Sequence, residues 1–391
     1  MTNKLAGNLE FDTTYSNKQI IFQLFCSHES ISRAELSRMT GLSKQTVSSA
    51  ISGLEAMKLV TPVGSTKGHI GRRAITYRLS PSASFAVGID LGGTSLRSGL
   101  IDFSGEVRSE FSRLTPLTNL NDLIQAILNS IQTLKNQAGV KEEIDLLVIG
   151  VPGVVHPVTG VVSMAPNVEY LNGVDLRKQL KEYFKFEVII ENDINLAAVG
   201  EKDSLKLEDF VFISLGTGIG MAVVLDGKLR RGSKGGAGEI GYMLFDIFDE
   251  NILNPKILED MLGGKALEKL YKGNTGNQLT VEEIFLLAKN NDEYASFLTK
   301  NMVKQLSSCL RNIIAILDPA TIIMGGGIGS RKDVLSELKK SLQNQVNQEF
   351  DIRTTSLGSR AGIVGAMSLA VKEIRDTAID KGQKLDYGVT S

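Results

Sequence analysis

The sequence predicts an α/β protein in which a small N-terminal domain precedes a larger body of two similar lobes. Three observations over its 391 residues support this prediction. Residues 1–80 contain ten Lys and Arg against five Asp and Glu, whereas the rest contains 33 against 39. The basic part shows helical patterns followed by a hairpin pattern. In the acidic part, a unit of strand, glycine-rich loop and strand occurs twice, about 120 residues apart. This division suggests two tasks, with a polyanion as partner of the basic part.

The bulk composition excludes several classes of protein. Hydrophobic residues make up 42% and charged residues 22%, which is typical of a soluble globular protein. No stretch approaches the roughly 18 uncharged apolar residues of a membrane span, and the polar start "MTNKLAGNLEFDTTYSNK" does not resemble a signal peptide. Cys26 and Cys309 lie too far apart in sequence to suggest a disulfide framework or a metal site. We therefore expect a cytoplasmic protein with no membrane association.

Residues 17–80 predict three helices and a hairpin, preceded by a loose arm at 1–16. The helical patterns lie in "NKQIIFQLFCSH" and "SRAELSRMTGLSKQTVSSAISGLEAMKLV", with Gly41 separating the second and third helices. Ser43 is placed to cap the third helix, because a serine hydroxyl accepts a hydrogen bond from a free backbone N–H of the first turn. The third helix is expected to turn three apolar side chains to the core: Val47, Ile51 and Leu54.

The start of that third helix carries small polar and amide side chains that suit the major groove of DNA. The hairpin "LVTPVGSTKGHIGRRAITYRLS" follows, with an arginine pair where it returns. In order and length of elements the segment resembles a winged helix-turn-helix, whose wing contacts phosphates or the minor groove. The alternative is a helical protein-interaction module with solvated charges. The residues expected to contact DNA are Ser43, Lys44, Gln45, Thr46, Ser48, Ser49, Arg72 and Arg73.

The body contains two glycine-rich hairpins that suggest a phosphate ligand. They lie in "FAVGIDLGGTSLRSGLID" and "FVFISLGTGIGMAVVLDGKL", and a third glycine cluster, "IIMGGGIG", follows another strand. Glycines let backbone N–H groups approach a phosphate closely, and Asp90 could hold a magnesium ion. Two such units in separate halves suggest duplicated lobes with a nucleotide or phosphate between them. The residues expected to bind it are Asp90, Gly92, Gly93, Thr94, Gly216, Thr217, Gly218 and Gly326.

Six motifs then occur in the order of a known family: "DLGGT", "PGVV", "ENDIN", "LGTGIG", "GGAGEIG" and "GGGIG". Over about residues 85–372 the body resembles the ROK family (repressors, open reading frames, kinases). The resemblance implies a two-lobe actin-like ATPase fold of the ribonuclease H-like kind. Together with the winged helix-turn-helix, the whole chain resembles ROK transcriptional repressors such as the xylose and N-acetylglucosamine repressors.

The segment "VIIENDINLAAVGE" places Asn192 and Asp193 at the end of a buried strand, where ligands bind in α/β sheets. The resemblance implies that Asn192 binds sugar hydroxyls. It also implies that Asp193 accepts a hydroxyl proton during phosphoryl transfer, if the protein is active. The alternative is that both residues only cap the following helix. The resemblance implies further sugar contacts at Asn167, Glu239 and Glu259, and the same wall carries Tyr242.

Tyr242 marks a departure from the family pattern. The resemblance implies a histidine at this position, which binds a structural zinc together with three cysteines. The segment "FDIFDENILNPKILED" contains neither cysteine nor histidine, so no zinc is expected. Ordinary packing should replace the metal, and Tyr242 either offers its hydroxyl to a sugar or fills the vacated space. The residues expected to provide that packing are Phe245, Ile247, Phe248, Ile252 and Leu253.

These features predict a sugar-responsive transcriptional repressor that binds operator DNA and a sugar or sugar derivative in the interlobe cleft. The alternative is an ATP-dependent sugar kinase with a DNA-binding head, since the phosphate loops and Asp193 are intact. A third hypothesis is a binding protein that uses ATP or a sugar phosphate as its signal. The repressor hypothesis requires no cofactor, although the loops could hold ATP and magnesium, and it predicts a homodimer or homotetramer. The expected domains are an arm at 1–16, the DNA-binding domain at 17–80, lobes at 81–195 and 196–375, and a polar tail at 376–391.

Overall fold

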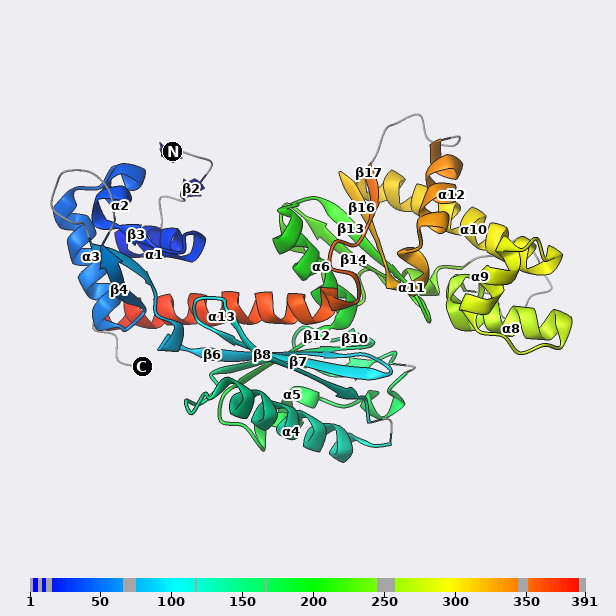
Figure 1. The fold of residues 1–391 in the computed structure, drawn as a ribbon, viewed down its shortest axis with the longest axis horizontal. Helices are drawn as coiled ribbons and strands as arrows, with labels where there is room; N and C mark the ends of the chain where they lie inside the picture. The colour runs from blue at the N-terminus through cyan, green and yellow to red at the C-terminus, as the bar shows by residue number, and fades with distance from the viewer. Residues whose placement is uncertain are drawn as a thin grey trace.

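The computed structural model describes residues 3–5, 9–11, 16–65, 75–116, 118–165, 167–244, 257–343 and 351–386. Figure 1 shows an elongated molecule of three parts. The head comprises residues 16–80, and lobes 1 and 2 are each built around a five-stranded sheet. Before the head, the expected arm contains a short antiparallel pair, β1 (Asn3–Leu5) and β2 (Leu9–Phe11).

The head has the order of elements expected of a winged helix-turn-helix. Ser16 and Ser32 each form a capping box at a helix start, and Gly41 ends α2 with a φ of 71°, which glycine adopts readily. Ser43 caps α3, as predicted, by accepting a 3.1 Å hydrogen bond from the Thr46 N–H. The predicted inward face of α3 is confirmed, because its three apolar side chains are fully buried. The elements are α1 (Asn17–Ser27), β3 (Ile31–Ser32), α2 (Arg33–Thr40), α3 (Lys44–Ala56), β4 (Val60–Ser65) and β5 (Ile75–Leu79).

The sheet of lobe 1 has the order β12-β9-β6-β7-β8. Its first three strands in sequence form an antiparallel meander, and β9 and β12 then add parallel to β6. The strands are β6 (Phe85–Leu91), β7 (Ser95–Asp102), β8 (Val107–Leu114), β9 (Leu146–Val151) and β12 (Glu187–Asn192). The remaining elements are η1 (Pro81–Ala83), α4 (Leu120–Ala138), β10 (Val154–Val155), β11 (Val162–Ser163), η2 (Glu169–Leu171) and α5 (Leu176–Lys181).

The sheet of lobe 2 repeats this plan with the order β15-β14-β13-β16-β17, an antiparallel meander followed by two parallel strands. The predicted duplication is therefore confirmed, and each glycine-rich loop joins the first two strands of its sheet. The strands are β13 (Phe210–Leu215), β14 (Ile219–Leu225), β15 (Lys228–Leu229), β16 (Thr321–Gly325) and β17 (Asp351–Thr354). The helices are η3 (Ile240–Tyr242), α7 (Glu259–Leu262), α8 (Gly264–Thr275), α9 (Val281–Lys289), α10 (Glu293–Leu317), α11 (Gly326–Gly329), α12 (Lys332–Gln343) and η4 (Gly358–Arg360).

Two helices connect the lobes: α6 (Asp193–Leu205) and α13 (Ala361–Asp386). They cross with their backbones in close contact at Gly200 and Gly365. A Cβ on Gly200 would lie 2.8 Å from the Ala361 carbonyl oxygen, and one on Gly365 would overlap the carbonyl oxygen of Leu196. Only residues without a side chain allow this crossing. Because α6 also packs on β13 and β14, the crossing lies where the two lobes meet.

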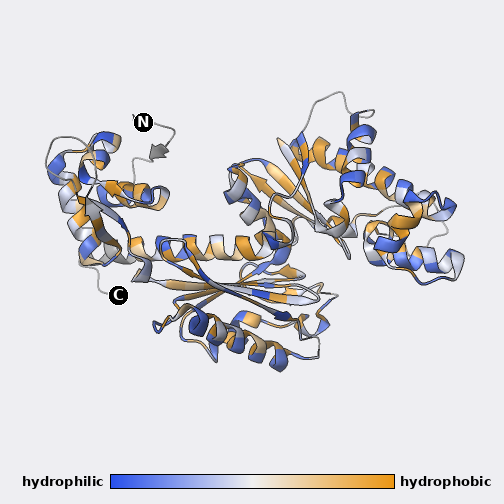
Figure 2. Ribbon diagram, in the orientation of Figure 1, coloured by the Kyte–Doolittle hydropathy of each residue, from blue (hydrophilic) through white to orange (hydrophobic). Residues whose placement is uncertain are grey.

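The C-terminal helix α13 joins lobe 1 to the head. Figure 1 shows it running from α6, along the sheet of lobe 1, to the head. Apolar residues recur along it in Figure 2, and its Ile374 and Ile379 belong to one buried cluster with the cores of α1 and α3. The expected tail at 376–391 therefore begins as helix, since α13 continues to Asp386. The 26 residues of α13 span about 39 Å.

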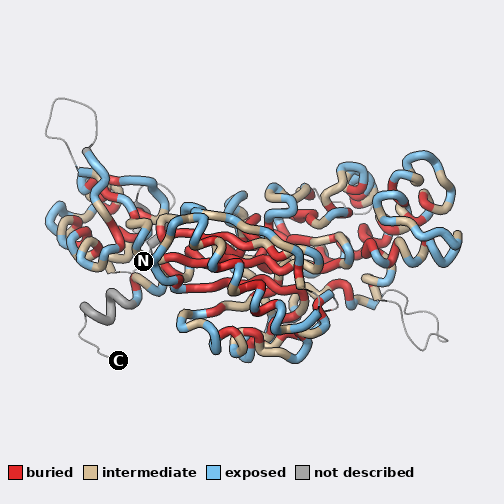
Figure 3. The backbone as a smooth tube through the Cα atoms, turned by 60° about the horizontal axis from the view of Figure 1, so that its bottom comes forward, coloured by how far each residue is buried: buried red, intermediate tan, exposed pale blue. Residues whose placement is uncertain are grey.

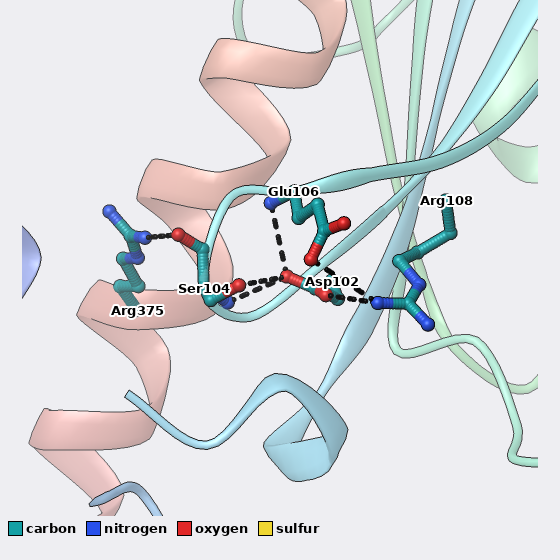
Figure 4. Close-up of polar contacts among 5 residues, drawn as sticks. All are labelled: Asp102, Ser104, Glu106, Arg108 and Arg375. Carbon is teal, nitrogen blue, oxygen red and sulfur yellow. Dashed lines mark hydrogen bonds and ion pairs between the residues drawn. The ribbon is translucent and has the colours of Figure 1, made fainter. Parts of the chain in front are cut away.

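Polar contacts at the turn between β7 and β8 fix α13 to lobe 1 (Figure 4). Arg375 on α13 donates to the carbonyl oxygens of Phe103 at 3.1 Å and Ser104 at 2.8 Å. Asp102, which is fully buried, accepts from the backbone N–H groups of Ser104 and Glu106 and so shapes the turn. The ring of Phe103 lies 6.1 Å from the Phe22 ring of the head. The head, this turn and α13 thus form one continuous core.

Two further features bear on the sequence-based expectations. Cys26 and Cys309 are free thiols, and burial raises the pKa of each to about 11, which keeps both protonated. Among the described residues, no helix combines the length and apolar character needed to cross a membrane.

Figure 3 shows buried residues concentrated in the central strands and exposed residues on the outer helices.

Candidate functional site

Acidic residues from both lobes are electrostatically coupled at the cleft. Asp90 lies near the end of β6, and Asp193 begins α6 directly after β12. Because β6, β9 and β12 are parallel, their carboxyl ends meet at one edge of the sheet. From lobe 2, Glu239 precedes η3 and Glu259 begins α7. The predicted acidic residues are therefore brought to one region of the molecule.

Asp193 is strongly perturbed by its surroundings. Burial, followed by the nearby charges of Asp90 and Glu239, raises its pKa to about 7. Its Oδ1 accepts a 2.9 Å hydrogen bond from the backbone N–H of Ile194, which opposes the rise. A carboxyl group that titrates near neutral pH can accept and return a proton under ordinary conditions. The role of Asp193 as a general base stays a prediction.

Asn192 has a structural role in this fold. Its side-chain oxygen accepts from the Asn195 N–H at 2.9 Å and caps α6. Its side-chain nitrogen donates to the carbonyl oxygen of Gly153, also at 2.9 Å. The capping interpretation is therefore confirmed for Asn192. Contact of Asn192 with a sugar remains a prediction.

In lobe 2, the charge of Glu259 acts on the ionisable groups of Glu239 and Tyr242. Burial and then the charge of Glu259 raise the pKa of Glu239. Burial, Glu259 and Glu239, in that order, raise the pKa of Tyr242, so its hydroxyl remains a hydrogen-bond donor. The Tyr242 side chain is 45% exposed, so it does not fill a closed space. The packing residues predicted at 245–253 lie outside the described residues.

The glycine loop of lobe 1 is held in a defined shape. Thr115 donates from its side chain to the Gly92 carbonyl oxygen at 2.7 Å and from its backbone to that of Thr94 at 3.1 Å. Asp90 lies beside the loop, 3.5 Å from the Arg97 guanidinium. Burial raises the pKa of Asp90, and Arg97 opposes that rise. A Cβ on Gly362, at the start of α13, would lie 2.7 Å from an Asp90 carboxylate oxygen, so α13 begins against this acid.

The glycine loop of lobe 2 packs against the start of α8. The carbonyl oxygen of Gly216 accepts from the Gly264 N–H at 2.8 Å, and that of Thr217 accepts from Lys265 at 3.3 Å. The Glu259 carboxylate occupies the space that a side chain on Gly218 would need. Of the other residues expected to bind phosphate, Gly93 packs against Asn167 and Gly326 has a φ of 77°; their contact with phosphate stays a prediction.

A cavity of about 750 Å³ lies mainly in lobe 2, between its glycine loop, α7 and α8, and Asn167 of lobe 1 lines one side of it. Four residues expected to bind ligands line it: Asn167, Thr217, Gly218 and Glu259. Lys265 also lines it, and its ammonium group donates a 3.0 Å hydrogen bond to the side-chain oxygen of Asn167, across the two lobes. Asn192, Asp193 and Glu239 do not line this cavity.

Two further contacts between the lobes have no signal in the sequence. Arg231, after β15, forms an ion pair with Glu191, a buried acid at the end of β12. Gly235 lies so close to lobe 1 that a side chain there would overlap the Val155 carbonyl oxygen. Part of the glycine-rich segment at 235–241 therefore serves the contact between lobes. Both contacts become apparent only once the lobes are placed together.

The predicted DNA-binding residues of α3 lie at its exposed start. Ser43, Lys44, Gln45 and Ser49 are exposed, while Thr46 and Ser48 are half-buried. The hydroxyls of Ser43 and Thr46 lie 2.9 Å apart within the cap. Arg72 and Arg73, predicted for the wing, lie outside the described residues. In the part of the chain that the structure describes, no group of three or more His, Cys, Asp or Glu side chains is arranged to hold a metal ion.

Two sheets of the same topology, each with a glycine-rich loop between its first two strands, define a two-lobed protein of the actin-like ATPase class. The ROK family model matches residues 86–373, and the chain belongs to the ROK family.

Three individual proteins show the extent of the similarity. The xylose repressor of Caldicellulosiruptor bescii is 26% identical over 92% of this chain and 96% of its own. A solved ROK transcriptional regulator, a homologue of the E. coli MLC protein, covers 94% of this chain and 98% of its own with a TM-score of 0.76 and 20% identity. A ROK glucokinase from Streptomyces griseus, solved with glucose and AMPPNP, covers 74% of this chain and 100% of its own with a TM-score of 0.61 and 25% identity.

Proposed function

We propose that this protein is a sugar-responsive transcriptional repressor of carbohydrate-utilisation genes. In this proposal the head binds operator DNA through the exposed start of α3, and a sugar or sugar derivative binds in the interlobe cleft. The C. bescii relative, a xylose repressor, is similar over nearly the full length of both chains, including the head. The S. griseus glucokinase covers 74% of this chain. This difference in coverage supports a regulator.

The cleft offers the groups that a sugar requires. Carboxylates accept hydrogen bonds from hydroxyls, and amides both donate and accept. Glu259 and Asn167 line the cavity, and Glu239 is coupled to Glu259. The volume of about 750 Å³ lies within the usual range for small-molecule sites. We therefore place the sugar between Asn167 of lobe 1 and the acids of lobe 2.

The observation that carries the proposal is the position of α13. Its first turn packs against Asp90 through Gly362, and its later residue Ile374 lies in the same buried cluster as the head. A ligand that closes the lobes would act at the α6–α13 crossing and would be felt at the head through this helix. Closure shifts DNA affinity only if the sugar binds the two states differently. DNA and sugar should therefore alter each other's affinity by the same factor.

Sugar-dependent DNA binding tests the proposal. DNA sites selected by the wild-type protein from a random library would be used in gel shifts with D-xylose, D-glucose and N-acetyl-D-glucosamine. We expect one sugar to change DNA affinity by about 5–150-fold. Lys44→Ala with Gln45→Ala should weaken binding, whereas Gln23→Ala on the exposed face of α1 should not. Failure to select any DNA would exclude the repressor function.

Kinase activity is the second candidate, because Asp193 titrates near neutral pH and both glycine loops are intact. The proposed function depends on operator binding by the head rather than on turnover of ATP. A coupled assay with ATP, magnesium and the same sugars separates the two. Turnover near 1 s⁻¹ or above, lost in Asp193→Asn, would establish an enzyme. A rate far below that value, with sugar-dependent DNA binding retained, would support the repressor.

A further inference from the structure

Lobe 2 contains a second cavity, of about 690 Å³, between α9, α10 and α12. It is separate from the cleft, since no residue that lines one of the two cavities lines the other. It is of a size that holds small molecules in other proteins. Neither the sugar site nor the DNA-binding head uses these three helix faces.

The floor of this cavity is apolar. Phe285 and Val334 are almost fully buried, and Ala288 and Val303 are half-buried beside them. These four side chains come from all three helices, so the floor is a fixed feature of the packing between them. Such a surface favours a ligand with an apolar part, because binding removes that part from water.

The rim is positively charged on one side. Lys289 ends α9, and Lys300 and Lys304 lie one helical turn apart on the same face of α10. All three are exposed, and in the described chain no carboxylate lies within ion-pair distance of any of them. Three ammonium groups around one cavity attract an anion.

The side formed by α12 is different, because its charges are already neutralised. Arg331 forms an ion pair with Asp333 at 2.8 Å and lies over the Phe285 ring at 4.0 Å. Lys340 pairs with Glu337 at 2.7 Å. The net positive charge of the rim therefore lies on α9 and α10, opposite the paired side chains of α12.

We propose that this cavity binds a small organic anion with an apolar body, either a phosphate ester or a carboxylic acid. The apolar body lies on Phe285 and Val334, and the anionic group meets Lys300 and Lys304. The protein then has a second ligand site in addition to the cleft. Arg331 lies two residues after α11 and donates its backbone N–H to the Ile328 carbonyl oxygen at 3.1 Å. A ligand in the cavity thus lies next to the glycine cluster that follows β16.

Four probes separate the contribution of the anionic group to binding from that of the apolar body. Isothermal titration of the full chain would use 1-naphthyl phosphate, 1-naphthoate, inorganic phosphate and 1-naphthalenemethanol. We expect at least one of the two naphthyl anions to bind at least tenfold more tightly than inorganic phosphate and the neutral alcohol. The better of the two identifies the ester or the acid as the preferred class. Equal binding of the anions and the alcohol, or no binding of either anion at millimolar concentration, would overturn the proposal.

Charge reversal then locates the site. Lys300→Glu with Lys304→Glu should weaken binding of the preferred anion at least tenfold. The matched control, Arg311→Glu with Lys339→Glu, makes the same change of charge on α10 and α12 outside the cavity and should leave affinity within twofold. Equal losses in both double variants would indicate a general charge effect and overturn the proposal.

A third variant separates this cavity from the cleft. Ala288→Phe places a ring on the cavity floor and should abolish binding of the naphthyl anions. Circular dichroism would establish that each variant is folded, and if Ala288→Phe does not fold, Val303→Met serves the same purpose. Glu259→Ala, in the cleft, should leave naphthyl binding unchanged. Loss of naphthyl binding in Glu259→Ala alone would place the ligand in the cleft and overturn the proposal.

Discussion

The two boundaries of lobe 1 differ in chemistry. Toward the head, the contact is apolar: Phe22 packs on Phe103, and Ile374 of α13 completes the same buried cluster. Toward lobe 2, α6 packs on β13 and β14 through apolar side chains, and polar contacts such as Arg231 with Glu191 and Lys265 with Asn167 add to this packing. Separating an apolar contact costs free energy in proportion to the apolar area that becomes exposed to water. The partners of an exposed polar pair can instead form hydrogen bonds with water, so separating them costs little. The head should therefore move with lobe 1, and lobe 2 should be the part that moves against them.

The largest effect is expected from breaking the apolar boundary. Phe22 is 1% exposed, and Phe22→Ala should lower the free energy of unfolding by about 3–5 kcal/mol. Thermal unfolding followed by circular dichroism would measure it, with Leu114→Ala, at an 82% exposed position, as control. Because the core is continuous, the transition of lobe 1 should shift together with that of the head. A shift confined to a separate head transition would contradict a fused head and lobe 1.

The pivot between the two boundaries is the next test. At Gly365 an added methyl group would overlap the Leu196 carbonyl oxygen, so Gly365→Ala must push α6 and α13 apart. We expect a loss of about 1–3 kcal/mol in stability, together with a changed response to sugar. Gly273→Ala on α8 is the matched control for the melting temperature only, because a Cβ there has no atom within 4 Å but the residue lines the cleft cavity. Equal melting temperatures for the two variants would show that the crossing is not close-packed.

The raised pKa of Asp193 predicts that the stability gained in Asp193→Asn depends on pH. The pKa of Asp193 is raised to about 7 in the folded protein. Between about pH 4 and pH 7 the folded protein therefore keeps a proton on this carboxyl group that the unfolded chain has released. This carboxyl group therefore costs stability as pH rises from about 4 to 7, and the cost is constant above 7. Asp193→Asn should gain stability relative to wild type by about 1–3 kcal/mol between pH 5 and pH 8. Unfolding in urea at both pH values measures this. A difference that does not change with pH would contradict the raised pKa.

The smallest effect is expected at the polar boundary itself. Arg231→Gln leaves the buried Glu191 without its ion-pair partner. The Arg231 side chain is 40% exposed, so the loss should be about 1 kcal/mol, below that for a fully buried pair. Small-angle scattering should show a more open molecule. The neighbouring Arg230→Gln breaks an exposed pair within lobe 2 and should leave the shape unchanged. An identical scattering curve for Arg231→Gln and wild type would mean that this pair does not hold the lobes together.

Much of this arrangement could be predicted from local patterns. The glycine loops, the acid after β12 and the cap at Ser43 follow from short stretches of sequence, because neighbouring residues fix a turn or a helix start. The contacts of Arg231, Gly235 and Lys265 could not be predicted, since each joins residues far apart in the chain. The route of α13 differs from the expectation for another reason. The polar composition of residues 376–391 predicts a tail, whereas apolar residues within this segment, such as Ile379, are buried in the structure.

The place of α13 also has a consequence for the synthesis of the protein. The head leaves the ribosome well before α13, the helix that completes its apolar cluster. At about 5–20 residues per second, roughly 15–70 s separate the two. During that interval the head exposes apolar surface that has no partner in the nascent chain. Chaperones that bind nascent chains should therefore associate with the head until α13 has been made.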